Sequence, residues 1–133
     1  MTDAATGIRK RAISCLAVLG TTLSETSLVA LNSELVKRLE AKCKPELTRT
    51  YIQAATALSR SVGYRFGRYL QACVPLLIKF CTEASESDDE LRENCLQALE
   101  AFVVKCPREV ETSVAEITKV NEKYSATYMH FKF

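Results

Sequence analysis

Six cysteines and one histidine are the side chains of this sequence that could most readily act as nucleophiles or metal ligands. They are Cys15, Cys43, Cys73, Cys81, Cys95, Cys106 and His130. No two cysteines form a C-x-x-C pair, and a zinc site would need ligands at closer spacing. We therefore expect no metal and no cofactor. With no export signal in view, the cysteines are interpreted as small buried apolar residues of an intracellular protein.

The other reactive residue types give little support to catalysis. A Ser/His or Cys/His system would depend on His130, close to the end of the chain. The four glycines form no phosphate-binding loop. Acid pairs such as Asp88 and Asp89 lie at a predicted helix start, with no apolar pocket in view that would raise a pKa. We expect a protein that is not an enzyme.

The acidic run from Glu83 to Glu93 contains six carboxylates. A calcium loop is one reading of such a run, but calcium loops need ligands that alternate around a glycine. Within the run, Ser87-Asp88-Asp89-Glu90 has the S-x-x-E form of a capping box, which places acids at the positive end of a helix dipole. The run therefore favours a helix start capped by Ser87 over a metal site.

Arginines are the more informative charged residues. Arg9, Arg49 and Arg92 each precede the apolar block of a predicted helix by three or four residues, where a cation could either join neighbouring helical units or contact a partner. A second group mixes cations with aromatic rings around a predicted turn, as interface hot spots often do, although a solvated loop explains it equally well. The candidate partner-binding residues are Arg49, Arg60, Tyr64, Arg65, Arg68 and Arg92.

Charge is distributed unevenly between the two parts of the chain. Residues 1–82 carry twelve Lys or Arg and five Asp or Glu, whereas residues 83–133 carry six and eleven. A nucleic-acid site would concentrate positive charge more strongly and add stacking aromatics, so we expect no nucleic-acid partner. The polarity fits electrostatic steering of a protein partner, although solvated helix faces alone could also produce it. No run is long and apolar enough for a membrane span.

Apolar residues recur at helical spacing almost throughout the chain, which predicts an all-α protein with about six helices. We expect a single domain over 1–133, with an inner helix at 8–20, hairpins at 28–63 and 66–106, an outer helix at 107–124 and a tail at 125–133. Pro45 and Pro107 are predicted to open helices, and Gly63 to end one in the αL conformation. Pro75 is predicted to kink or break the fourth helix.

Internal repetition predicts how these helices are arranged. The segments beginning at Ile13, Ile52 and Leu96 align at offsets of 39 and 44 residues, with large apolar residues in their first and last columns and small ones between. A two-helix unit that recurs at this period indicates a HEAT-repeat α-solenoid, an armadillo-like short right-handed stack of hairpins. Small residues at Ala54, Ala57, Ala98 and Ala101 would let neighbouring helices approach closely. Neither end looks capped, so the chain is either a piece of a longer array or has open ends that another chain covers, with self-association as one form of such cover.

Several stretches of the chain resemble one HEAT-repeat family at polar as well as apolar positions, which is more specific than the general HEAT pattern of apolar residues. They are Thr48–Gln53, Tyr69–Cys81, Asp88–Glu93, Ala101–Val103 and Lys105–Val110. Together they resemble consecutive N-terminal repeats of the cullin-associated and neddylation-dissociated family, over Arg9 to about Tyr124. The resemblance implies a regulator of cullin–RING ubiquitin ligases, whose N-terminal repeats lie against the cullin and its RING subunit and shield the lysine that receives the ubiquitin-like modifier.

Two departures limit what the resemblance implies. The chain has far fewer repeats than the family protein and lacks the C-terminal repeats that displace the substrate adaptor during exchange of substrate receptors. Its tail, Ser125 to Phe133, also differs from the acidic segment expected there. There are two competing interpretations, and neither involves cullin binding. One is a structural HEAT scaffold segment whose partner is the remaining repeats of the same regulator, and the other is a nuclear-transport HEAT fragment. The expected location is cytoplasmic and nuclear.

Overall fold

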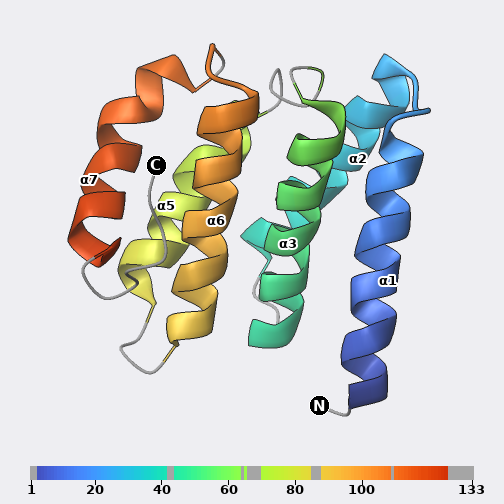
Figure 1. The fold of residues 1–133 in the computed structure, drawn as a ribbon, viewed down its shortest axis with the longest axis horizontal. Helices are drawn as coiled ribbons and strands as arrows, with labels where there is room; N and C mark the ends of the chain where they lie inside the picture. Colours follow the sequence, from blue (N-terminus) through green and yellow to red (C-terminus); the bar gives the residue numbers. More distant parts are fainter. Residues whose placement is uncertain are drawn as a thin grey trace.

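A computed structural model describes residues 3–41, 44–63, 65, 70–84, 88–108 and 110–125 (Figure 1). Within these ranges the chain forms six α-helices and one 3₁₀ helix, and no strand. They are α1 (Asp3–Gly20), α2 (Glu25–Glu40), α3 (Pro45–Val62), α5 (Leu70–Glu83), α6 (Asp89–Lys105), η1 (Glu111–Ser113) and α7 (Val114–Ser125). The predicted all-α HEAT-repeat fold is confirmed.

The helices are arranged in two layers (Figure 1). In one layer α3 packs between α1 and α6, and in the other α5 packs between α2 and α7. The layers are joined where α2 contacts α3 and where α5 contacts α6. Helices far apart in the sequence therefore lie side by side in the order of their repeats, which is the arrangement of a solenoid.

The helix ends follow local signals in the sequence. Ser24 is the N-cap of α2, because its side chain accepts a hydrogen bond from the backbone N–H of Ser27. Pro45 is the first residue of α3, as predicted. Gly63 follows α3 with a positive φ of 55°, although its ψ of −129° lies outside the predicted αL region. A positive φ still favours glycine at this position.

The acidic run begins a helix, as predicted, but a second predicted helix start is wrong. The N-cap of α6 is Asp88, whose carboxylate accepts from the backbone N–H of Leu91 at 3.2 Å, and the predicted capping residue Ser87 lies outside the described residues. Pro107 does not open a helix: it lies in a turn after α6, and helical backbone resumes at η1. The turn carries Val110 into the core, where its side chain is 1% exposed. Burial of that valine favours the turn over immediate helix propagation.

Pro75 does not break the fourth helix, because α5 continues through it to Glu83. A proline leaves the carbonyl of the preceding turn without its helical hydrogen bond. Pro75 lies on the exposed side of α5, where water can reach that carbonyl. The part of the predicted helix at residues 66–69 lies outside the described residues.

One core runs between the layers. Its largest fully buried side chains include Ile52, Leu58, Leu77, Leu99 and Phe102. The small residues predicted at helix contacts are buried at Ala54, Ala98 and Ala101, whereas Ala57 is half-buried. Four cysteines are buried, as predicted, at Cys73, Cys81, Cys95 and Cys106. Cys15 is exposed, contrary to the prediction, and Cys43 lies outside the described residues.

Candidate protein-binding interface

Arg49, near the start of α3, connects two neighbouring repeats. Its guanidinium nitrogens lie 3.8 Å from Asp88 Oδ1 and 3.7 Å from Glu90 Oε2, both at the start of α6. The Arg49 side chain is only 18% exposed, which reduces solvent screening of these ion pairs. The geometry supports a role in holding α3 against α6. Contact with a partner stays a prediction for this residue.

Arg92 occupies the corresponding position in α6 and is 8% exposed. Its Nε donates to the carbonyl of Cys81 at 3.2 Å and its Nη2 to the carbonyl of Ala84 at 2.7 Å, which satisfies backbone acceptors at the end of α5. Its guanidinium also lies 4.6 Å from the ring centroid of Tyr124 in α7. One side chain thus joins α5, α6 and α7, and its burial leaves little surface for a partner.

Arg65 is directed back towards the first repeat. Its guanidinium donates to the carbonyls of Thr21 and Leu23 and lies 3.5 Å from Glu25 Oε1. These contacts tie the region after α3 to the turn between α1 and α2. The predicted partner-binding residues Tyr64 and Arg68 lie outside the described residues, so their grouping with Arg65 stays a prediction.

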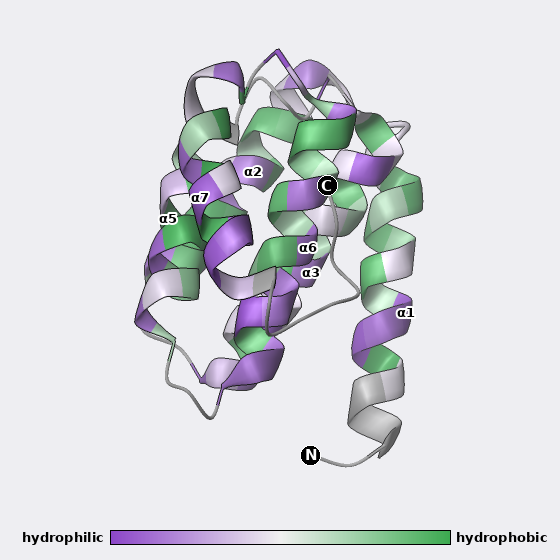
Figure 2. Cartoon of the chain, turned by 60° about the vertical axis from the view of Figure 1, so that its left-hand side comes forward, coloured by the Kyte–Doolittle hydropathy of each residue, from purple (hydrophilic) through white to green (hydrophobic). Residues whose placement is uncertain are grey.

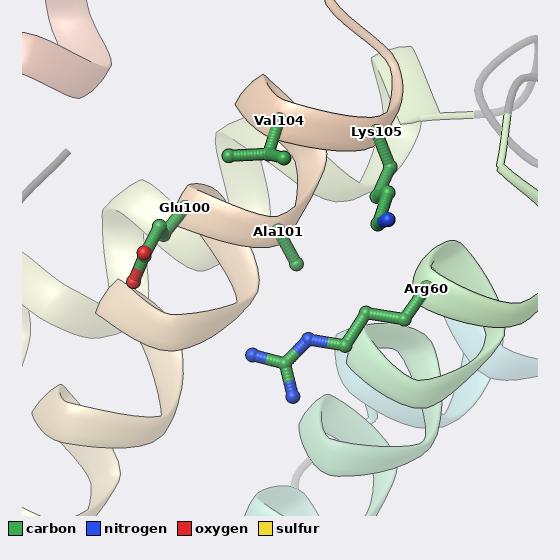
Figure 3. Close-up of a pocket in the computed structure, with 5 residues that line it drawn as sticks. All are labelled: Arg60, Glu100, Ala101, Val104 and Lys105. Atoms are coloured by element: carbon green, nitrogen blue, oxygen red, sulfur yellow. The ribbon is translucent and has the colours of Figure 1, made fainter.

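Arg60 differs from these three arginines because it is exposed and lines a surface hollow of about 270 Å³. The hollow lies between α3 and α6, and we call it the α3–α6 hollow. Its lining residues are Arg60, Glu100, Ala101, Val104 and Lys105. Figure 3 shows the Arg60 guanidinium extending towards α6, with Lys105 at the end of α6. Two cations beside an exposed valine could receive a partner that presents a carboxylate next to an apolar side chain.

A second surface feature, the α1–α2 groove, has a volume of about 300 Å³. Its apolar lining consists of Ile8, Ala12, Ile13, Leu16, Leu31, Leu35, Tyr51 and Ala54, with Arg9, Glu34, Arg38 and Thr50 completing it. Arg38 is held at the rim by Glu34, at 2.9 Å, and by the Tyr51 hydroxyl, at 3.1 Å. An apolar groove with a charged rim suits an apolar side chain of a partner protein.

Sequence reasoning did not identify Lys105 or the α1–α2 groove. Lys105 was read only as part of a family-like stretch, and its place beside Arg60 depends on packing across 45 positions of sequence. The groove combines residues from three helices whose apolar periodicity indicated a buried face. One feature of the sequence could have indicated the groove. At the offset of 39 residues, Ala12 of the first repeat aligns with the larger Tyr51, so the first repeat has a smaller side chain at this position.

The described residues include few side chains that are placed to bind a metal ion or to act as a nucleophile. Among them, no group of three His, Cys, Asp or Glu is placed to hold a metal ion. No described helix is both long and apolar enough to cross a membrane. Burial raises the pKa of the Cys73 and Cys81 thiols to about 11 and raises that of Cys95 further. These thiols are therefore protonated, and weakly nucleophilic, at neutral pH.

The inter-repeat contacts share a common spacing that supports the repeat assignment. Ser61 Oγ donates to the carbonyl of Ala17 at 2.7 Å, and Gln53 Nε2 donates to Asn94 Oδ1 at 3.3 Å. The partners are 44 and 41 residues apart. These hydrogen bonds join neighbouring repeats, and the α3–α6 hollow and the α1–α2 groove are open to solvent.

Comparison with known proteins supports the resemblance seen in the sequence. The chain is 47% identical over 118 residues to cullin-associated NEDD8-dissociated protein 1 of Arabidopsis thaliana. It is 39% identical to the protein of that name from Dictyostelium discoideum, and 39% identical to cullin-associated NEDD8-dissociated protein 2 of Mus musculus. Each match covers 88% of this chain and 10% of the relative. The chain thus spans about a tenth of the length of these relatives, and no family model matches it.

Proposed function

We propose that this chain, a homologue of one segment of the cullin-associated NEDD8-dissociated proteins, is a non-catalytic protein-binding module of cullin–RING ligase regulation. The observation that carries the proposal is the 47% identity over 88% of the chain to a protein named for its association with cullins. A HEAT solenoid supports this kind of function, because stacked helices present an extended surface to another protein.

The proposed partner is a cullin together with its RING subunit. By binding an unneddylated cullin, the chain would contribute to its sequestration and, as part of a larger assembly, to exchange of substrate receptors. We propose the cytoplasm and the nucleus as its locations. Imaging of the tagged chain in cells would test the location separately from binding.

The α3–α6 hollow is the surface that we propose contacts the cullin. Arg49, Arg65 and Arg92 make contacts within the chain, whereas the exposed Arg60 of α3 and Lys105 of α6 line the hollow. Their charges would attract acidic residues of the partner, and Val104 offers apolar area beside them. Tyr64 and Arg68, close to Arg60 along the chain, are proposed to extend this surface.

The test measures binding of the 133-residue chain to a purified cullin–RING pair by biolayer interferometry. Because the chain supplies only one short segment, we expect a dissociation constant of roughly 10–100 µM for the unneddylated pair. Binding to the neddylated pair should be at least about tenfold weaker if the chain approaches the modified lysine. A chain concentration of several hundred micromolar is about ten times the expected dissociation constant. If the chain did not bind the unneddylated pair at that concentration, the scaffold interpretation would replace the proposal.

Charge-reversal substitutions test whether the α3–α6 hollow is the surface that contacts the cullin. Arg60→Glu and Lys105→Glu should each weaken binding at least about fivefold, since each replaces an attraction by a repulsion. Lys119→Glu is the matched control, because Lys119 is an exposed cation on α7 away from the hollow. Equal effects of all three substitutions would indicate non-specific charge attraction instead of a site at the hollow.

A further inference from the structure

The α3–α6 hollow carries charges of both signs. Figure 3 shows the Glu100 carboxylate and the Lys105 ammonium directed to different ends of the hollow, with Ala101 and Val104 between them. The two charged residues are five positions apart in α6, which separates them by about 7.5 Å along the helix axis and by about 140° around it. The hollow therefore has an acidic end at Glu100 and a basic end, which Arg60 reinforces.

The hollow lies inside the stack of repeats, between two helices that are both described. On its other side α3 packs against α1, and α6 also packs against α5 and α7. The hollow is therefore a property of the contact between two complete neighbours in the array.

The corresponding contact in the preceding pair of helices, between α1 and α3, is formed differently. Ser61 aligns with Lys105 at the offset of 44 residues, and its hydroxyl donates to the carbonyl of Ala17 at 2.7 Å. No charged residue follows Arg11 in α1, and Figure 2 shows mainly hydrophobic colour in the C-terminal half of that helix. The repeat thus packs at this position without a charged pair such as Glu100 and Lys105.

Glu100 also differs from the residue with which it aligns. At the offset of 44 residues its counterpart in α3 is Thr56, which is buried and donates its hydroxyl hydrogen to the carbonyl of Ile52 at 2.9 Å. In α6 a longer, ionisable and half-buried side chain takes the place of this packing residue. The carboxylate at the hollow is therefore not a requirement of the repeat.

Other residues join α3 to α6 along the rest of their length. Arg49 pairs with the start of α6, Gln53 Nε2 donates to Asn94 Oδ1, and Cys106 Sγ donates to the carbonyl of Gly63 at 3.2 Å. The contact between the two repeats is thus held at both ends and in the middle, and the charges at the hollow are available for another purpose.

The size of the hollow indicates what it can receive. Its volume of about 270 Å³ is below the range of roughly 300–1,000 Å³ that is typical of small-molecule pockets. Val104, at its rim, is 63% exposed. A space of this size next to an exposed apolar residue suits one apolar side chain of a partner protein, with charged neighbours on either side of it.

We propose that Glu100 is a specificity-determining residue of the α3–α6 hollow. It selects a partner helix that carries a carboxylate and a cation on either side of an apolar side chain. The partner's carboxylate would lie at Arg60 and Lys105, its apolar side chain at Val104, and its cation at Glu100. This inference rests on the proposed function, because it defines the kind of cullin segment that the hollow binds.

Glu100 acts by repulsion as well as by attraction. With Arg60 and Lys105 alone, the hollow would attract any acidic segment. The carboxylate of Glu100 opposes a second acidic group and attracts a basic one, so it discriminates between partners of different charge pattern. On a partner helix, a carboxylate and a cation seven positions apart lie on one face, about 10.5 Å apart along the axis, with room for an apolar residue between them.

The first test uses the unneddylated cullin–RING pair and biolayer interferometry. Glu100→Lys should weaken binding of the 133-residue chain at least about threefold, although it makes the hollow more positive. A purely acidic contact surface would bind Glu100→Lys more tightly, so the sign of the change decides between the two charge patterns. Glu100→Gln should weaken binding by a smaller factor, because it removes the attraction and adds no repulsion. Glu116→Lys is the matched control, since Glu116 is exposed on α7.

The second test needs no cullin and compares two alanine-based peptides of about 18 residues, a length that supports partial helicity. The bipolar peptide carries Glu, Leu and Lys on one face, with Glu and Lys seven positions apart, and the acidic peptide has Glu in place of that Lys. Each is titrated to roughly 2 mM into the ¹⁵N-labelled chain, with the amide signals of Val104 and Lys105 as the readout. The unsubstituted chain should bind the bipolar peptide at least about threefold more tightly, and Glu100→Lys should reverse the preference.

The two tests separate this inference from the proposed function. If the chain does not bind the cullin–RING pair, the proposed function fails, and the peptide comparison still decides the role of Glu100. Tighter or unchanged binding of the pair by Glu100→Lys would overturn the inference while leaving cullin binding in place, as would the same loss in Glu116→Lys. Equal binding of the two peptides, or no shift at Val104 and Lys105 with either, would also overturn it.

Discussion

Gly20, the last residue of α1, is in direct contact with the buried Leu58 of α3. A Cβ atom at Gly20 would stand 2.8 Å from Leu58 Cδ2 and 3.4 Å from Val62 Cγ1. The first distance is shorter than carbon atoms tolerate, so any side chain at this position must displace Leu58, which is fully buried. The close approach of the first two repeats therefore depends on the missing side chain of Gly20.

Substitution of Gly20 by valine should destabilise the chain by about 2–3 kcal/mol, because the branched side chain overpacks the contact between α1 and α3. The free energy of unfolding can be measured by urea denaturation followed by circular dichroism. Gly7→Ala is the control within the same helix, since a Cβ at Gly7 would meet no atom within 4 Å. Alanine there should be neutral or stabilise by up to about 1 kcal/mol through helix propensity. Equal destabilisation by both would contradict the steric explanation.

Replacement of Arg92 by alanine should lower the free energy of unfolding by about 2–4 kcal/mol. The substitution leaves the carbonyls of Cys81 and Ala84 without their donor and removes the contact with Tyr124. Arg92→Lys should recover only part of the loss, because an ammonium cannot reach both carbonyls with the geometry of a guanidinium. Arg108→Ala, in the exposed turn after α6, should change stability by less than about 0.5 kcal/mol. A small effect of Arg92→Ala would show that water replaces these contacts.

Most of the fold follows from local features of the sequence. Apolar periodicity located the helices, Pro45 marked the start of α3, and the positive φ of Gly63 agrees with its predicted place after that helix. The capping residue of α6 was misplaced by one position because Ser87 and Asp88 can both cap a helix and only the final geometry selects between them. The start of the last helix was misplaced because burial of Val110 is a tertiary effect that periodicity does not report.

The candidate interface was predictable only in part. The positions of Arg49 and Arg92 near helix starts were visible in the sequence, but their partners were not. Asp88 lies 39 residues after Arg49, and the acceptors of Arg92 are backbone carbonyls that carry no sequence signal. The exposure of Cys15 depends in the same way on which helix covers α1. Sequence patterns identify a face that is fit for burial, whereas the neighbour that buries it is set by the assembled structure.

Buried and exposed cysteines should react at very different rates. At pH 8, DTNB should modify Cys15 within seconds to minutes in a Cys43→Ser chain, whereas Cys73, Cys81, Cys95 and Cys106 should react only after denaturation. For Cys73 and Cys81, a pKa of about 11 in place of 9.0 lowers the thiolate fraction about a hundredfold, in addition to the steric protection. Rapid modification of more than one thiol in the native chain would contradict the packing described for α5 and α6.

The same pKa shifts predict a loss of stability at alkaline pH. A thiol whose folded pKa is raised above its unfolded value binds its proton more tightly in the folded state. Its stabilising effect is complete below about pH 9 and is lost as the pH rises towards 11. The urea concentration at the midpoint of unfolding should therefore decrease as the pH is raised from 8 to 10.5. The slope of this decrease against pH should be smaller in Cys73→Ala. An unchanged slope in that variant would assign the alkaline loss to other groups.

Asp88 combines two roles that substitution can separate. Its carboxylate caps α6 by accepting from the Leu91 N–H, and it also lies 3.8 Å from Arg49 Nη1. Asp88→Ala removes both interactions and should cost about 1–2 kcal/mol, most of it from the lost cap. Asp88→Ser keeps a capping oxygen but no charge, so it should cost about 0.5 kcal/mol, as should Arg49→Ala. Urea denaturation at low and high salt tests how the stabilisation by Asp88 is divided between the cap and the ion pair. Added salt should reduce the loss of stability caused by Arg49→Ala and leave the loss caused by removing the cap unchanged. If Asp88→Ser were as destabilising as Asp88→Ala, the ion pair with Arg49 would be the main contribution of this residue, and the contact between the two repeats would depend on charge more than on the start of α6.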